Sequence, residues 1–171
     1  MEQVLWKILG IFLSVILMFI VPIMHLYERQ DTISYSVIST QLNQMTDSAR
    51  DIGRLDASAY QTFLRALDQT GNSYLINLEH YEKVYVPVYN DSGLFMEDYH
   101  ISYEGFYKDD IEAILSSGGF YPMEQGDMFF VSVQNVTPTK SQIVRQILYG
   151  MDPQYPSLIV RGGGMVRHES Y

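Results

Sequence analysis

The sequence predicts an α+β fold: a long N-terminal helix, transmembrane and then amphipathic, packed on a small, mostly antiparallel sheet with two or three short helices. Three observations lead to this prediction. Residues 8–24 are apolar and uncharged, and a helical stripe of apolar residues continues from Ile33 to Ile52. Beyond Gly53, short β-rich runs alternate with short helical patterns, as expected for an α+β domain.

The apolar stretch from Ile8 to Met24 has the length of a membrane span. Its seventeen residues would rise about 26 Å as a helix, close to the hydrocarbon thickness of a bilayer. Trp6 and Tyr27 flank it, where interfacial aromatic residues are expected. We therefore predict a transmembrane anchor at residues 1–27 and an extracytoplasmic α+β domain at residues 28–171.

Several features favour an uncleaved anchor over a signal peptide. The apolar region is longer than a usual signal core, lacks a basic segment before it and lacks an A-x-A site after it. Lys7 precedes the apolar segment and Arg29 follows it, so the difference in positive charge between its two sides is small. The orientation of the segment in the membrane is therefore predicted from the size of the domain that follows it. A short tail before a large domain favours an internal N-terminus and an external domain in the cell membrane.

The amphipathic half of the helix carries its apolar residues at steps of three and four. That spacing defines one face of an α-helix and predicts a seam that packs on the sheet: Ile38, Leu42, Met45, Ala49 and Ile52. Neither Gly nor Pro interrupts residues 27–52, so we expect one rod of about 50 residues, on the order of 70 Å long. A bend is expected at Pro22, whose ring clashes with the carbonyl of Met18.

The first part of the predicted domain contains one helix and two strands. Asp56 is a candidate N-cap for a helix over 57–69 that packs antiparallel on the rod, with Gly71 just past its end. A strand over 74–81 would place four side chains on one face: Tyr74, Ile76, Leu78 and His80. A second strand is predicted at 84–89, where Pro87 indicates an edge or a bulge.

Elements in the middle of the chain are less regular. Residues 90–93 have turn chemistry, and residues 94–107 predict a loop with a short strand at 99–103. A helix over 109–115 is followed by glycines, and the apolar run at 127–133 predicts a central strand.

The C-terminal part predicts a helix and two short strands. Thr137 and Pro138 have the chemistry of a helix start, with Gly150 as the end. The expected buried face of this helix comprises Ile143, Val144, Ile147 and Leu148. Strands are predicted at 157–160 and 165–167, with the glycines between them forming a hairpin turn or allowing close backbone approach.

Charge and composition exclude several classes of partner and chemistry. The net charge is −9, and Glu2 and Lys7 cancel within residues 1–27, so the excess lies in the soluble part. This argues against nucleic acid and anionic headgroups as partners. The absence of cysteine excludes disulfides, thiol catalysis and zinc–thiolate sites.

No catalytic or cofactor signature is present. The histidines at 25, 80, 100 and 168 lack metal-site spacing, and we expect them at solvated or edge-strand positions. The acidic clusters lack calcium-loop spacing, and the glycines after Arg161 lack the Lys-Ser/Thr of a phosphate loop. The sequence therefore predicts no enzyme, metal or cofactor. An enzyme would be favoured instead if the carboxylates of Glu97, Asp98 and Asp109 converged in a buried pocket.

The N-terminal region resembles the pilin and pseudopilin proteins of type IV pilus and tight-adherence (Tad) systems. The matching features are the apolar helix at 8–24, Pro22 within it, and the amphipathic continuation to Ile52. Gly10 before Ile11 and Phe12 is similar to a prepilin leader end, although the family's Glu at the fifth position is replaced by Val15. The resemblance implies a helix that anchors the subunit in membrane and then bundles in a filament core.

The predicted function is a single-pass structural subunit of a bacterial surface filament or secretion apparatus. Its expected partners are membrane lipid and other copies or pilin-like subunits, and the small residues Gly10 and Ser14 would let two helices approach closely. The predicted membrane and assembly residues are Ile8, Gly10, Phe12, Ser14, Ile16, Phe19 and Pro22. The alternative is a membrane-tethered binding or sensor domain with an aromatic surface made of Tyr81, Tyr85, Tyr89, Phe106 and Tyr107.

Overall fold

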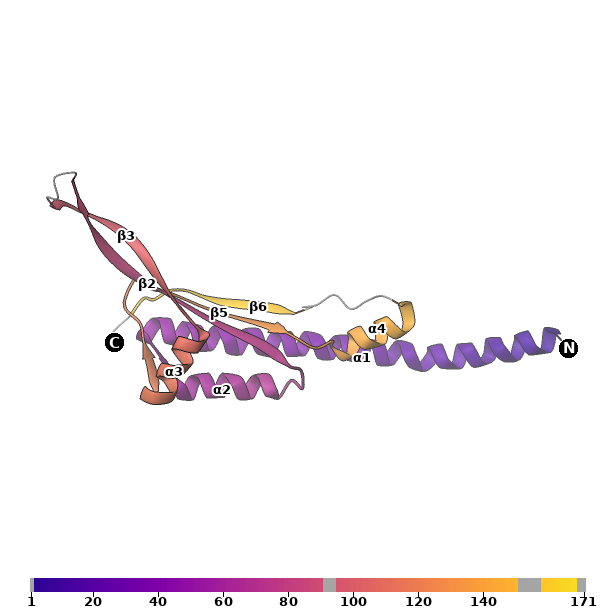
Figure 1. Ribbon diagram of the computed structural model, residues 1–171. Helices are drawn as coiled ribbons and strands as arrows, with labels where there is room; N and C mark the ends of the chain where they lie inside the picture. The colour runs from indigo at the N-terminus through magenta and orange to yellow at the C-terminus, as the bar shows by residue number, and fades with distance from the viewer. Residues whose placement is uncertain (1, 91–94, 151–157, 169–171) are drawn as a thin grey trace.

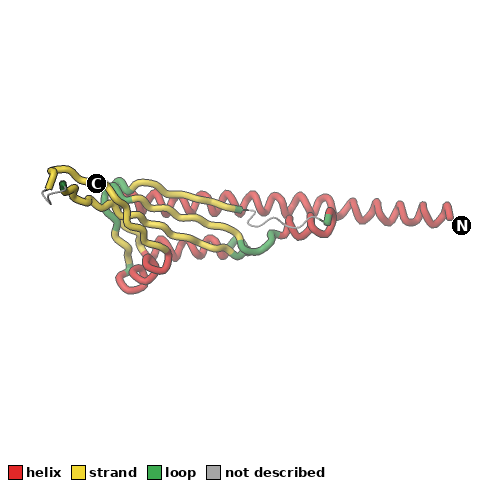
Figure 2. The backbone as a smooth tube through the Cα atoms, turned by 45° about the horizontal axis from the view of Figure 1, so that its top comes forward, coloured by secondary structure: helices red, strands yellow, loops and turns green. Residues whose placement is uncertain are grey.

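The computed structural model describes residues 2–90, 95–150 and 158–168, apart from the side chains of Glu2 and Glu97. A long helix runs from the N-terminus through the head, the other elements gather around its C-terminal half, and the β2–β3 arm extends beyond its end (Figure 1). The N-terminal half extends beyond them (Figure 2). The predicted α+β fold is confirmed.

Helix α1 spans Glu2–Ile52 as one 51-residue element. It passes through Pro22 without interruption, so the predicted rod is confirmed as a single helix. Figures 1 and 2 show at most gentle curvature near this point, not the sharp bend expected there. The helix ends at Gly53, whose φ of 76° is left-handed and whose N–H donates to the carbonyl of Ala49 at 2.9 Å.

The head contains a four-stranded antiparallel sheet in the order β3-β2-β5-β6, a two-stranded sheet β1-β4, and three short helices. The strands are β1 (Arg54–Asp56), β2 (Tyr74–Tyr89), β3 (Phe95–Tyr107), β4 (Phe120–Pro122), β5 (Met128–Asn135) and β6 (Ile159–Met165). The helices are α2 (Ala57–Asp68), α3 (Lys108–Gly118) and α4 (Lys140–Tyr149).

The core lies between α1, α2 and the inner face of the large sheet. Four of the five predicted seam residues are buried there, but Ile52 is 51% exposed because the chain turns away at Gly53. The seam therefore ends at Ala49. The core residues from these elements include Ile38, Leu42, Met45, Ala49, Phe63, Leu67, Ile76, Leu78, Phe129, Val131 and Val133.

Two of the helices predicted within the head are confirmed close to their predicted bounds. Helix α2 begins after Asp56, but the Asp56 side chain makes no capping hydrogen bond and instead pairs with Arg54 at 3.2 Å. Helix α3 covers the predicted 109–115 and ends at Gly119 in the left-handed conformation.

The central sheet differs from the prediction in its strand lengths. The two strands predicted at 74–81 and 84–89 are one continuous strand, β2, and the loop predicted at 94–107 is the paired strand β3. Strand β2 pairs with β5 only as far as Tyr81 and beyond that with β3 alone. Pro87 is tolerated because it lies in this two-stranded arm, next to a register shift.

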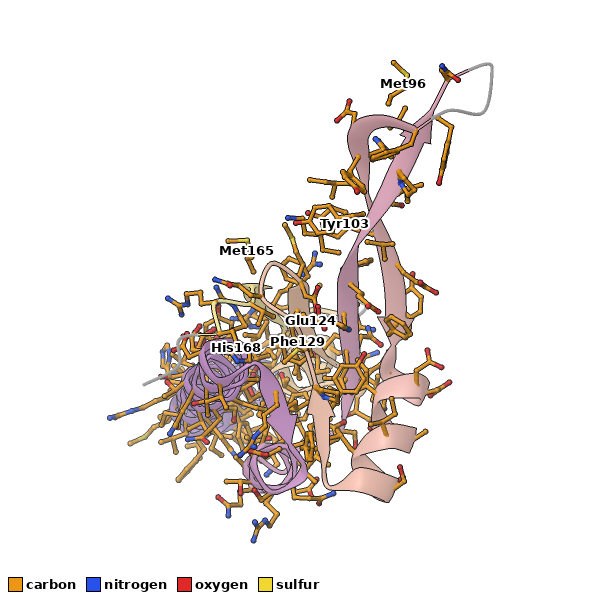
Figure 3. The ribbon with its side chains drawn as sticks, turned by 90° about the vertical axis from the view of Figure 1, so that its left-hand side faces the viewer. Met96, Tyr103, Glu124, Phe129, Met165 and His168 are labelled. Atoms are coloured by element: carbon orange, nitrogen blue, oxygen red, sulfur yellow. The ribbon has the colours of Figure 1, made fainter. Side chains whose placement is uncertain are left out.

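The arm formed by β2 and β3 projects away from the rest of the head (Figure 1). Figure 3 shows Met96 toward its tip and Tyr103 closer to the sheet. The turn predicted at 90–93 falls mostly outside the described residues, which resume at residue 95. Strand β5 lies between β2 and β6, as its apolar sequence predicted.

The glycines at 162–164 lie inside β6 and do not form a hairpin turn. They satisfy the other predicted use of the triplet, a close backbone approach. A Cβ built on Gly162 would lie 2.2 Å from Leu42 Cδ2 of α1, and one on Gly163 would lie 2.1 Å from the carbonyl oxygen of Phe129. The triplet therefore lets β6 lie close to both α1 and β5.

Helix α4 starts two residues later than predicted. Its N-cap is Thr139, and Thr139 and Gln142 form a capping box, whereas Thr137 lies before it. The apolar face predicted to be buried is largely exposed, with Ile147 77% exposed and Val144 and Leu148 half-buried. The reason is that α4 contacts α1 through the side that carries Ser141 and Arg145, which leaves Ile143 and Ile147 facing outward.

Replacing Gly163 with alanine tests the close approach within the sheet. Gly163 has φ of 128° and faces backbone atoms of β5, which cannot move aside as a side chain can. We expect Gly163→Ala to lower the free energy of unfolding by about 2 kcal/mol or more in denaturant titrations of the detergent-solubilised chain. Gly118→Ala is the matched control, because its Cβ meets nothing within 4 Å. Equal free energies of unfolding for the two variants would contradict a close approach of Gly163 to the backbone of β5.

Candidate functional site

The N-terminal half of α1 makes no packing contact that buries it in the described chain. Its most apolar 18-residue window has a mean hydropathy of 2.6, and 0% of that window is buried. By length and composition this segment could serve as a membrane span or as a signal sequence. Water is a poor solvent for so large an apolar surface, which is the property that membrane spans and signal sequences share.

The predicted assembly residues occupy different faces of this segment. Ile8, Phe12 and Phe19 are large and exposed, and they lie on one side of the helix. Gly10 and Ser14 lie on the opposite side, in a shallow depression that Lys7, Ile11 and Val15 complete. Ile16 is half-exposed and Pro22 is exposed. A Cβ on Gly10 would meet nothing within 4 Å, so the depression is open to a neighbouring helix.

Polar contacts fasten α4 to α1 just past the apolar segment. Arg145 donates to Glu28, and Ser141 donates to Asp31. Thr139, the N-cap, also donates to Asp31, at 2.7 Å. The hydrogen bond from Arg145 holds the pKa of Glu28 below its ordinary value. An open groove of about 410 Å³ lies beside these contacts, and Tyr35 and Ile159 help to line it.

A second groove, between α1 and the end of α2, is more apolar. Its volume is about 540 Å³, and Leu26, Ile33 and Val37 of α1 line one side. All three side chains are exposed. Their spacing continues the apolar surface of the N-terminal segment into the head, on the side of α1 that the sheet does not cover. This stripe is therefore available to another helix.

The predicted aromatic surface divides between two faces of the arm. Antiparallel partners lie on the same face, so the pairing of Tyr85 with Ile101 and of Glu79 with Tyr107 places Tyr81, Tyr85 and Tyr107 together on the outer face. Tyr89 contacts Phe95 at a ring separation of 6.1 Å. Phe106 lies on the inner face instead.

The outer face of the arm is rich in exposed rings. Lys83 lies 4.7 Å from the ring centre of Tyr85, and Phe95 and Tyr99 contact edge to face at 5.3 Å. Such rigid amphipathic rings are common in protein interfaces. The sequence pattern did not indicate Tyr99 and Tyr103 as part of this surface, because their place on the outer face follows from the pairing of β3 with β2.

His80 is buried, contrary to the expectation of a solvated or edge position. It lies on the inner face of β2 at 3% exposure and stacks on Phe106 with ring centres 5.8 Å apart. Its Nδ1 bonds to the Tyr121 hydroxyl at 2.8 Å, and its Nε2 to Asp127 Oδ2 at 3.0 Å. The alternation of 74, 76, 78 and 80 was the signal that placed it inward.

The His80 cluster is a structural network. Asp127 also accepts from the backbone N–H groups of Lys83 at 2.9 Å and Glu124 at 2.7 Å. Both ring nitrogens of His80 are therefore occupied, and the carboxylate is nearly saturated. An imidazole in this arrangement has no free nitrogen to offer a substrate, whereas it does join β2, β4 and the segment before β5.

Other titratable residues do not converge. Asp109 and Asp110 are in the first turn of α3, and Asp110 accepts from the Tyr107 N–H at 3.2 Å. Asp98 lies on β3, far along the arm, and the Glu97 side chain lies outside the described residues. His25 and His100 are exposed. Among the described residues, no group of three or more His, Cys, Asp or Glu side chains could hold a metal ion.

No family model, curated protein or solved structure matches the chain. The architecture itself is pilin-like, since a long N-terminal apolar helix packs its second half against an antiparallel sheet. The candidate functional sites are therefore surfaces. They are the apolar segment of α1, the two grooves where α1 leaves the head, and the outer face of the arm.

The buried Tyr121 makes the stability of the head depend on pH in the alkaline range. Burial raises its pKa to about 12, against about 10 in an unfolded chain. The unfolded state therefore loses its proton first, and stability falls as pH rises from 10 toward 12. We expect a smaller fall between pH 9 and pH 11 in Tyr121→Phe than in Tyr103→Phe, which alters an exposed tyrosine. Identical losses in denaturant titrations would contradict this.

Proposed function

We propose that this chain is a membrane-anchored, non-enzymatic structural subunit, pilin-like in build, of a bacterial surface filament or secretion apparatus. The observation that carries the proposal is the division of α1. One helix has its C-terminal half in the core of a folded head and its N-terminal half without any partner in the described chain. A helix of this kind is suited to anchor a subunit in lipid and then to bundle with neighbours.

The continuity of α1 supports assembly over simple tethering. No Gly or Pro separates residues 27 and 52, and the seam from Ile38 to Ala49 is buried in the head. The head is therefore rigidly oriented relative to the apolar segment. Contacts made by that segment with its neighbours would then set the position of every head in an assembly.

The exposed apolar stripe of α1 gives such contacts a continuous surface. It passes from the apolar segment through Leu26, Ile33 and Val37 beside the groove against α2. A parallel helix of a second copy would meet the small-residue depression at Gly10 and Ser14, and a helix of a further copy would meet the stripe, which lies on the opposite side of α1. The acidic head, which carries the net charge of −9, would remain in solvent outside the cytoplasm.

Electron microscopy of cell envelopes tests this proposal on the native protein. We expect filaments or a discrete envelope complex that antibodies against the head decorate. Dispersed single-pass monomers, with neither filament nor complex, would overturn it.

A matched pair of variants tests the assembly surface in the same material. Gly10→Leu fills the depression between helices, and we expect it to abolish assembly, because close backbone approach is lost. Leu9→Met is the control, because it is a conservative apolar exchange at an exposed position outside both the depression and the stripe, and it should retain assembly. Both variants must be present in the membrane in equal amounts. Normal assembly of Gly10→Leu would exclude this face from the interface.

The second candidate function is a membrane-tethered binding or sensor domain. The projecting arm favours it, because Tyr85, Tyr99 and Tyr103 are exposed on one face at a distance from α1. A head separated from residues 1–28 that is monomeric and retains a ligand by itself would support this function over the structural one.

A further inference from the structure

Helix α4 presents an apolar surface that nothing in the described chain covers. Within α4, all of which the structure describes, Ser141 is the one buried residue. Ile143, Ile147 and Tyr149 are exposed, and Ile147 is among the most exposed large apolar side chains of the molecule. The side of α4 that faces α1 combines Ser141 and Arg145 with the half-buried Val144 and Leu148, and Ile143 and Ile147 lie on the outward side.

The contacts with α1 fix the level of α4 along the long helix. Ser141 lies at Asp31, and Arg145, one turn later, lies at Glu28. Helix α4 therefore advances toward the N-terminus of α1 as it proceeds, and Figure 1 shows its C-terminal end farthest in that direction. Ile147 and Tyr149 follow Arg145 and lie nearer still to the apolar segment.

The distance from the apolar segment is that of a lipid headgroup layer. Glu28 is four residues beyond Met24, about 6 Å along the helix axis. The headgroup region adds roughly 5 to 8 Å on each side of a hydrocarbon core. If Met24 ends at the hydrocarbon boundary, Arg145 lies in this layer and the residues after it approach the acyl chains.

We propose that the C-terminal half of α4 is inserted in the surface of the membrane, with Ile147 and Tyr149 in contact with lipid. This inference rests on the proposed function, in which α1 spans that membrane. The level of α4 along α1 identifies lipid as the occupant, since Arg145 lies beside Glu28, four residues from the end of the apolar segment, and Ile147 follows Arg145 toward that segment. Tyrosine and large apolar side chains are both common where a protein meets the membrane interface.

The chemistry of α4 favours a neutral, zwitterionic surface. Its cations are Lys140, at the end away from the membrane, and Arg145, whose charge is paired with Glu28. It therefore lacks the free basic side chains by which interfacial helices select anionic lipid. A second membrane contact beside α1 would also restrict rotation of the head about the long helix and fix which face meets a neighbour.

Site-directed fluorescence tests the inference on the full chain in phosphatidylcholine vesicles. The sequence has no cysteine, so single-cysteine variants carry one environment-sensitive label each. The label is placed at Ile147→Cys, at Leu17→Cys as the reference inside the apolar segment, and at Ile114→Cys as the matched exposed isoleucine on α3. Quenchers attached to the acyl chains report contact with lipid, and iodide reports contact with water.

We expect a blue-shifted emission at residue 147, with lipid quenching between the values at residues 17 and 114. Quenching at 17 but a value at 147 equal to that at 114 would overturn this inference alone. Absence of lipid quenching at 17 would overturn the proposed membrane function, and the inference with it. A blue shift at 147 without lipid quenching would also overturn the inference, because protein would then cover the helix.

Discussion

The close approach of α1 to the sheet is the constraint on which the rest of the structure depends. Leu42 is fully buried and lies where a side chain on Gly162 would be, 2.2 Å from the position of its Cβ. Gly163 then allows the same strand to lie against the backbone of β5. Because α1 is one unbroken helix, this packing also determines where the apolar segment leaves the head.

Local patterns predicted the long helix, its buried stripe and the inward face of β2, because periodic burial leaves a signal at each residue. The sequence could not reveal the β2–β3 arm, since β3 has weak alternation and is held by pairing with residues as far away in sequence as Glu79, the partner of Tyr107. The glycines at 162–164 were ambiguous because their partners, Leu42 and Phe129, are far away in sequence. The His80–Asp127 contact and the exposed face of α4 likewise depend on tertiary neighbours.

The functional surfaces follow from one asymmetry in α1. The seam of its C-terminal half is buried within the chain, whereas its N-terminal half is exposed and apolar, as a membrane span or a signal sequence is. The polar contacts of Glu28 and Asp31 with α4 lie at the junction of these two environments. The aromatic arm lies at the other end of the head, where it would be presented outward. The exposed apolar segment, the polar contacts with α4 and the aromatic arm are thus separated along a single axis.

A spin-label scan along α1 in lipid bilayers tests the central claim most directly. Nitroxides at successive single cysteines from residue 8 to residue 52 report mobility and accessibility to oxygen and to a polar relaxation agent. The account predicts that oxygen reaches the labels on every face of the helix through residue 24 and that the boundary between lipid and water lies near Tyr27. Labels in the head should be immobile at Ile38, Leu42, Met45 and Ala49, with the helical periodicity unbroken from the apolar segment. Water accessibility throughout residues 8–24, or loss of helical periodicity at Tyr27, would contradict it.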